Sequence, residues 1–163
     1  MNAPDGAVRP VRSYEARLGG EVLILDKDTN SDRTRDNARY SDCQDALYNV
    51  VALTDEDGAV AERVWYEPYG EATCRRESDG QEQAKSFFDN PYLFQGRRWC
   101  TESSLYYFRN RDLSPTLGRF LQRDPLGHEG SQSIYEFILS SPCTVGDPFG
   151  AEPNVVADKS RAQ

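Results

Sequence analysis

The strongest constraint on the fold is a pair of strand-like segments joined by a tight turn at residues 49–66. The first segment, NVVALTD, is rich in β-branched residues, and DEDG at 55–58 places Gly58 where a positive φ angle costs little. In the second segment, AVAERVWYE, one set of side chains at 60, 62, 64 and 66 alternates with a second set at 61, 63 and 65. Because successive residues of a β-strand point to opposite faces, this pattern predicts an antiparallel hairpin.

Further segments of the same kind favour a mainly β fold built of twisted antiparallel hairpins. YLFQGRRW at 92–99 and LYYFRNRDL at 105–113 are aromatic segments joined by CTESS, which predicts a second hairpin. VLILD at 22–26 is a continuous apolar run and predicts a short buried strand. The polar stretch CRRESDGQEQAKS at 74–86 predicts an exposed loop.

One or two short helices are expected towards the C-terminus, near 114–122 and 131–141. The second of these, SQSIYEFILSS, spaces its apolar residues as an amphipathic helix does and ends before Pro142, whose ring restricts the preceding residue. Around this β-rich region, residues 1–39 are expected to be loosely ordered apart from the strand at 22–26. Residues 151–163 are short and polar, which predicts a disordered tail.

Charge and composition exclude several classes of partner. The formal net charge is -8, and no stretch gathers the Lys/Arg cluster that nucleic acids or anionic membranes require. No apolar run approaches the length of a membrane span, and the N-terminus lacks the apolar core of an export signal, which leaves localisation open. The four cysteines show no CxxC spacing and the chain has one histidine, so no metal and no cofactor are predicted.

Two D-P-x-G motifs, DPLG at 124–127 and DPFG at 147–150, stand near the C-terminus. Taken alone, each motif is a good turn, because Asp bonds to the following backbone, Pro sets φ and Gly closes the reversal. The residues of these turns are Asp124, Pro125 and Gly127 in the first motif and Asp147, Pro148 and Gly150 in the second.

Three longer stretches carry a family resemblance. DALYNVVALTDEDGAVAERVWYEPYGEA resembles a YD-type repeat, NPYLFQGRRWCTESSLYYFRNRDLSPTLGRFLQRDPLG resembles the signature of the Rhs repeat-associated core, and IYEFILSSPCTVGDPFG resembles its closing segment. The resemblance to the Rhs family covers residues 40–150. It implies a segment of a hollow β-shell that encloses a C-terminal toxin, with the core region at the closing end, and it is typical of secreted or cell-surface proteins.

The resemblance also implies an intramolecular aspartyl protease that cuts just after the second motif. Carried over by position, its residues are Arg111, Asp124 and Asp147. Two carboxylates held close together do not both ionise easily, so one can serve as an acid while the other activates water, and an arginine can position the pair. The chain departs from the family pattern at Tyr48 and Ser104, where glycine is usual, and at Asp112 and Leu113, where two tyrosines are usual.

Three functions remain open at this point. The chain is expected to be a structural shell segment, a truncated remnant without cargo, whose partners are the rest of an Rhs shell or a separately encoded toxin. Alternatively, it is a cis-acting autopeptidase that cuts once near residues 150–153. A third alternative is an interaction module in which open strand edges recruit another β-rich chain or a second copy of this one.

Overall fold

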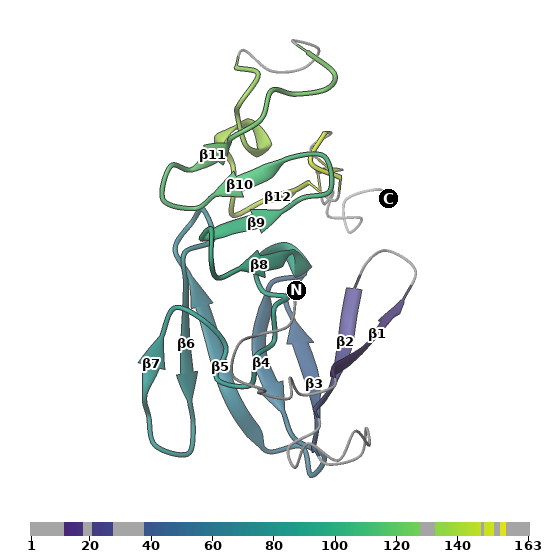
Figure 1. Ribbon diagram of the computed structural model, residues 1–163, viewed down its shortest axis with the longest axis vertical. Helices are drawn as coiled ribbons and strands as arrows, with labels where there is room; N and C mark the ends of the chain where they lie inside the picture. Colours follow the sequence, from purple (N-terminus) through teal and green to yellow (C-terminus); the bar gives the residue numbers. More distant parts are fainter. Residues whose placement is uncertain are drawn as a thin grey trace, which may run out of the picture.

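The computed structural model describes strands at residues 12–17, 21–27 and 154–155, and it describes backbone and side chains for residues 38–127, 133–147 and 149–151. Its larger part is a seven-stranded sheet in which strands follow one another in chain order, each antiparallel to the next (Figure 1). These strands are β1 (Arg12–Arg17), β2 (Glu21–Lys27), β3 (Ala38–Gln44), β4 (Val50–Thr54), β5 (Val60–Tyr66), β6 (Ala72–Arg76) and β7 (Glu82–Gln83).

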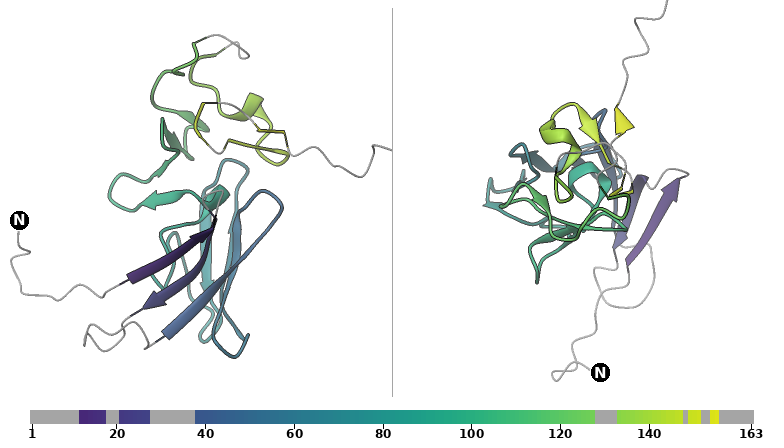
Figure 2. Two further views of the ribbon diagram at one scale, coloured as in Figure 1. Left: turned by 90° about the vertical axis from the view of Figure 1, so that its right-hand side faces the viewer. Right: turned by 90° about the horizontal axis from the view of Figure 1, so that it is seen from above.

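A second, four-stranded antiparallel sheet has the strand order β11, β10, β9, β8 and lies across one end of the larger sheet (Figures 1 and 2). Its strands are β8 (Arg98–Cys100), β9 (Leu105–Tyr107), β10 (Asp112–Ser114) and β11 (Arg119–Phe120). The remaining elements are two 3₁₀ turns, η1 (Phe94–Gly96) and η2 (Ile138–Ser140), and a small antiparallel pair, β12 (Val145–Gly146) and β13 (Asn154–Val155).

The mainly β fold and the hairpin at 49–66 are confirmed. Strands β4 and β5 pair antiparallel, and Gly58 in their turn has a φ of 82°. The Asp55 carboxylate fixes this turn by accepting hydrogen bonds from the backbone N–H groups of Asp57 (3.1 Å) and Ala59 (2.8 Å). Along β5, Glu62 and Val64 are buried whereas Arg63 and Trp65 are exposed, as the alternation predicts.

The second hairpin is shorter and more divided than predicted. β8 and β9 pair as expected, but LYYFRNRDL contains two strands, because the chain reverses after Phe108. Arg109 has a φ of 66° there, and the Phe108 N–H donates to the Arg111 carbonyl (2.8 Å). Before β8, Phe94–Gly96 forms the turn η1 in place of a strand.

The helix predicted at 114–122 is wrong. Strand β10 ends at Ser114, the chain turns through Gly118 with a φ of 62°, and β11 returns beside β10. In the described part of 131–141, from Ser133, helical structure is limited to the three residues of η2, two of whose φ angles are 45° and 52° at Ile138 and Leu139. In the first case, backbone pairing between β10 and β11 takes the place of the expected helix.

Three further segments contribute strands that the sequence did not predict. The segment 74–86 contains the end of β6 and all of β7, which pair as a hairpin. Strand β1 lies within the N-terminal region expected to be loosely ordered, and β13 lies within the segment expected to be disordered. The predicted strand at 22–26 is present as β2, whereas residues 28–37 of the expected loop lie outside the described residues.

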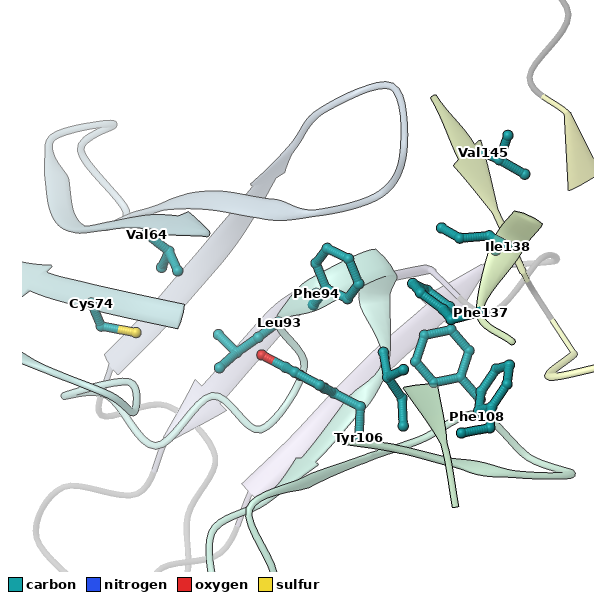
Figure 3. Close-up of a cluster of buried hydrophobic side chains, with 11 residues drawn as sticks. Val64, Cys74, Leu93, Phe94, Tyr106, Phe108, Phe137, Ile138 and Val145 are labelled. Atoms are coloured by element: carbon teal, nitrogen blue, oxygen red, sulfur yellow. The ribbon is translucent and has the colours of Figure 1, made fainter. Parts of the chain in front are cut away.

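The main core lies where the two sheets meet (Figure 3). Tyr106 is fully buried and its hydroxyl donates to the Gly70 carbonyl (3.0 Å), which ties β9 to the turn between β5 and β6. Three phenylalanines, 108, 120 and 137, pack edge to face with ring centroids 5.4–5.6 Å apart. The cluster consists of Val64, Cys74, Leu93, Phe94, Tyr106, Phe108, Leu113, Phe120, Phe137, Ile138 and Val145.

Candidate functional site

The structure brings together the three residues that the family resemblance implies. Arg111 precedes β10, Asp124 follows β11 and Asp147 follows β12. The Arg111 guanidinium bridges the two carboxylates, with Nη1 2.8 Å from Asp124 Oδ2 and Nη2 3.5 Å from Asp147 Oδ2. The Arg111 cation therefore binds two carboxylates, and the three side chains come from three separate segments, next to β10, β11 and β12.

Arg111 is held by a ring contact and a backbone hydrogen bond in addition to its two aspartates. Its side chain is 3% exposed, and its Cζ lies 3.8 Å from the centroid of the Phe120 ring, which belongs to the phenylalanine trio. Its Nε donates a hydrogen bond to the Gly150 carbonyl oxygen at 2.6 Å. Burial lowers the pKa of Arg111 from its usual value, while the two aspartates act in the opposite direction.

Asp147 is buried directly beside the backbone that follows it. Its side chain is 2% exposed, and Oδ1 accepts from the N–H groups of Phe149 (3.1 Å), Gly150 (2.7 Å) and Ala151 (3.2 Å). Burial raises the pKa of Asp147, and these N–H groups and Arg111 oppose that shift. The carboxyl group therefore sits against the Gly150–Ala151 peptide bond.

Asp124 is more accessible, with its side chain 15% exposed. Its Oδ1 accepts from the Leu126 N–H (2.8 Å), and its carbonyl accepts from the Gly127 N–H (3.1 Å), so the first D-P-x-G motif forms a closed turn through Pro125. Gly127 has a φ of 74° in that turn. Pro148 of the second motif and His128 lie outside the described residues.

Gly150 packs so tightly that no side chain fits at its position. A Cβ there would lie 2.4 Å from the Phe108 carbonyl oxygen, and the residue has a φ of 67°. The neighbouring Phe149 carbonyl accepts from Asn110 Nδ2 (2.9 Å), and Arg109 lies over the Phe149 ring at 4.9 Å. The side chains of the turn between β9 and β10 thus hold the segment that follows Asp147, and the turn backbone packs closely against Gly150.

Asp112, the acidic neighbour of Arg111, faces a different partner. Its Oδ2 accepts from Gln122 Nε2 (2.7 Å), and its N–H donates to Gln122 Oε1 (2.6 Å). Adjacent strand residues point to opposite sides, so Asp112 and Arg111 diverge. The departure from the family pattern at Asp112 therefore leaves the Arg111 ion pairs intact.

Other residues of the site carry no sequence signal. The Phe120 ring packs against the Arg111 guanidinium, and the Gln95 side chain donates to and accepts from the backbone at Val145 and Asp147. Both residues lie in aromatic, strand-like stretches of sequence that contain no recognisable motif for these roles. Their roles depend on contacts between residues distant in the chain. Among the described residues, no group of three or more His, Cys, Asp and Glu side chains is placed to hold a metal ion, and no helix is long and apolar enough to cross a membrane.

Comparisons with known proteins give sequence relatives and solved structures of similar fold. No family model matches the chain. The chain is 35% identical over 108 residues to the Escherichia coli protein YlbH, and the matched region covers 66% of this chain and 42% of YlbH. It is 42% identical over 60 residues to the toxin protein Tse5 of Pseudomonas aeruginosa, which covers 37% of this chain and 5% of Tse5.

Among solved structures, a chain of the TcdB2–TccC3–Cdc42 crystal structure matches 87% of this chain with a TM-score of 0.68 and 19% identity, and the match covers 6% of that longer chain. The chain therefore spans less than half of YlbH and a small fraction of the other two proteins. At this identity the structural match shows a shared fold. The chain is thus similar in sequence to segments of YlbH and Tse5, and it shares its fold with a segment of a chain in the TcdB2–TccC3–Cdc42 structure.

Proposed function

We propose that this chain is the closing segment of a toxin-associated β-shell of the Rhs type, and that it cuts itself once, between Gly150 and Ala151. The observation that carries the proposal is the placement of Arg111. Its guanidinium holds both aspartates while its Nε donates to the carbonyl of the peptide bond to be cut. Each chemical role in peptide hydrolysis then has a residue in place.

The reaction uses one water molecule and leaves two chain ends. Asp124, the more exposed aspartate, accepts a proton from the water as the water oxygen attacks the Gly150 carbonyl carbon. Arg111 Nε stabilises the negative charge that develops on the carbonyl oxygen. Asp147, protonated, donates its proton to the Ala151 nitrogen as the C–N bond breaks. The new Gly150 carboxylic acid then returns a proton to Asp147, which leaves a Gly150 carboxylate and an Ala151 amine.

The relatives support the shell part of the proposal. Tse5 is a toxin protein, and the structural match belongs to a complex of TcdB2 and TccC3. The partners proposed for this chain are accordingly the rest of an Rhs shell and a toxin cargo. Cleavage after Gly150 would separate the shell segment from whatever polypeptide follows it.

The test is the intact mass of the full chain carrying an inert protein after Gln163. We expect two products that correspond to cleavage between Gly150 and Ala151, and an uncut chain for Asp124→Asn and for Asp147→Asn. Asp112→Asn is the matched control, because this neighbouring aspartate contacts Gln122 and should leave cleavage unchanged. Cleavage that persists in both site variants would refute the mechanism.

A purely structural role for the same cluster is the second candidate. It is favoured by the number of contacts that hold the chain around Gly150, namely three N–H groups on Asp147 Oδ1 and the Arg111–Gly150 bond. In that case the unchanged fusion stays at full mass while folded. The two aspartate variants then lower the melting temperature without altering any cleavage.

A further inference from the structure

Gln95 is a buried side chain in η1 that contacts the backbone on both sides of Gly146, beside the site. It is 3% exposed and lies in η1, the turn that precedes β8. Its Oε1 accepts from the Asp147 N–H (3.1 Å), and its Nε2 donates to the Val145 carbonyl (3.2 Å). The amide thus makes two bonds to alternate residues of one extended segment, as a neighbouring strand would.

The backbone of Gln95 is tied to the seven-stranded sheet and to a second buried arginine. Its N–H donates to Asn49 Oδ1 (2.9 Å), immediately before β4, and its carbonyl accepts from Arg97 Nε (3.0 Å). Gln95 has a φ of 49° and a ψ of 31°, the left-handed region in which residues other than glycine are rare. A residue held in such a conformation and fully used in hydrogen bonding points to a specific requirement for its side chain.

We infer that Gln95 is a positioning residue for self-cleavage, which sets the backbone of Asp147 against Arg111 and the Gly150 carbonyl and makes this placement depend on the larger sheet. The inference rests on the proposed function. Its physical basis is that Asp147 has no other described bond to its own N–H, so the amide of Gln95 fixes where that backbone lies. Small misplacements of reacting groups reduce rates strongly, by up to about a hundredfold for about 1 Å.

Two substitutions separate positioning from folding. Gln95→Gly removes the side-chain bonds but suits the left-handed backbone, so the fold should be retained. Gln95→Glu keeps an acceptor for the Asp147 N–H and adds a negative charge near the Asp147 carboxyl group. Asn90→Ala is the matched control, because Asn90 is equally buried but its side chain bonds to Asp42 and to the Tyr92 N–H, away from the site.

The experiment follows cleavage of the full chain with its C-terminal fusion by intact mass over time, across a range of pH, with hydrogen exchange at residues 145–151. We expect Gln95→Gly to cleave at about one tenth of the rate of the unchanged chain or slower. The Asp147 amide should exchange faster in this variant, and the melting transition should be retained. We expect Gln95→Glu to cut with the upper pH limit of its profile displaced upward, because the added charge favours protonated Asp147. Asn90→Ala should change the melting temperature and leave the cleavage profile in place.

The outcomes separate the inference from the proposed function. If the unchanged chain cuts and Gln95→Gly cuts at the same rate, the positioning role is wrong although the autopeptidase stands. If the unchanged chain does not cut, the proposed function fails. Hydrogen exchange then still decides whether Gln95 fixes the backbone of Asp147, because unaltered exchange of the Asp147 amide in Gln95→Gly would overturn that contact's role.

Discussion

At the scale of single residues, Ser104 has a backbone conformation that suits glycine better. It lies in the turn between β8 and β9 with a φ of 55°, and Tyr48, in the turn before β4, has a φ of 64°. These are the two positions at which the family pattern usually has glycine. Both residues therefore retain the turn at a conformational cost of about 1 kcal/mol each, the usual penalty for a side chain in the left-handed region.

Ser104→Gly should stabilise the protein. Ser104 is exposed and its N–H donates to the Cys100 carbonyl (2.9 Å), a bond that glycine keeps. Relief of the left-handed strain exceeds the added flexibility of the unfolded chain, so we expect a gain of about 0.5 kcal/mol in the free energy of unfolding. Thermal and urea unfolding measure it. The control is Ser103→Gly at the preceding residue, which is not among the residues with a positive φ, so this change should be neutral or destabilising. Equal effects of the two changes would contradict the argument.

At the scale of elements, a buried acidic pair lies beneath the segment 86–90. Asp42 on β3 and Glu62 on β5 are each in register with Leu53 of the strand between them, so they share one face of the sheet. Asn90 Nδ2 donates to Asp42 Oδ1 (3.1 Å), and the Phe87 N–H donates to Glu62 Oε2 (2.6 Å). Among the described residues, Asp42 Oδ2 and Glu62 Oε1 have no hydrogen-bond partner.

This pair should make stability fall as the pH rises. Burial raises the pKa of Asp42 from 3.8 to about 7, and it raises the pKa of Glu62 as well. A carboxyl group whose pKa is higher in the folded state contributes stability that is complete below 3.8 and is lost as the pH rises through about 7. Each pH unit in that window should cost at most about 1.4 kcal/mol for one such group.

Urea unfolding at a series of pH values tests this expectation. Asp42→Asn should flatten the dependence, because the side chain then stays neutral throughout. Asp57→Asn, on the exposed turn between β4 and β5, should leave the slope as it is. Stability that is constant or rises between these pH values in the unchanged chain would show that Asp42 is ionised in the folded protein.

At the scale of the whole molecule, β1 is the outermost strand of the seven-stranded sheet among the strands that the structure describes. Within that described part it pairs with β2 on one side only, and the backbone N–H and C=O groups of such an edge favour association with another strand. In the proposed β-shell, further strands would cover such an edge. We therefore expect this chain on its own to self-associate with increasing concentration, which sedimentation velocity measures.

Proline at successive positions of β1 identifies the edge that associates. Successive N–H groups along a strand point to opposite sides, so of Ser13→Pro and Tyr14→Pro one removes a bond to β2 and the other blocks the open edge. We expect one variant to reduce association while keeping the melting transition, and the other to destabilise the fold. A monomer at all concentrations in the unchanged chain would contradict the prediction.

The sequence by itself determined the features that depend on near neighbours. The hairpin of β4 and β5 follows from alternation and a turn at Gly58, and the reversals at Gly127 and Gly150 follow from the chemistry of D-P-x-G. The order of motifs, through the family resemblance, also singled out Arg111, Asp124 and Asp147. These features are local in the chain, or are encoded as an ordered pattern, and can be read without coordinates.

Only the tertiary structure decided the features that depend on contacts between distant residues. Pairing with β11 made a strand of residues that a local reading assigned to a helix near 114–122. The bonds of Gln95 to the Asp147 backbone and the burial of Asp42 and Glu62 join segments far apart in sequence. The physical reason is that hydrogen-bond partners and burial are properties of the packed molecule, and a side chain's own sequence neighbours do not fix them.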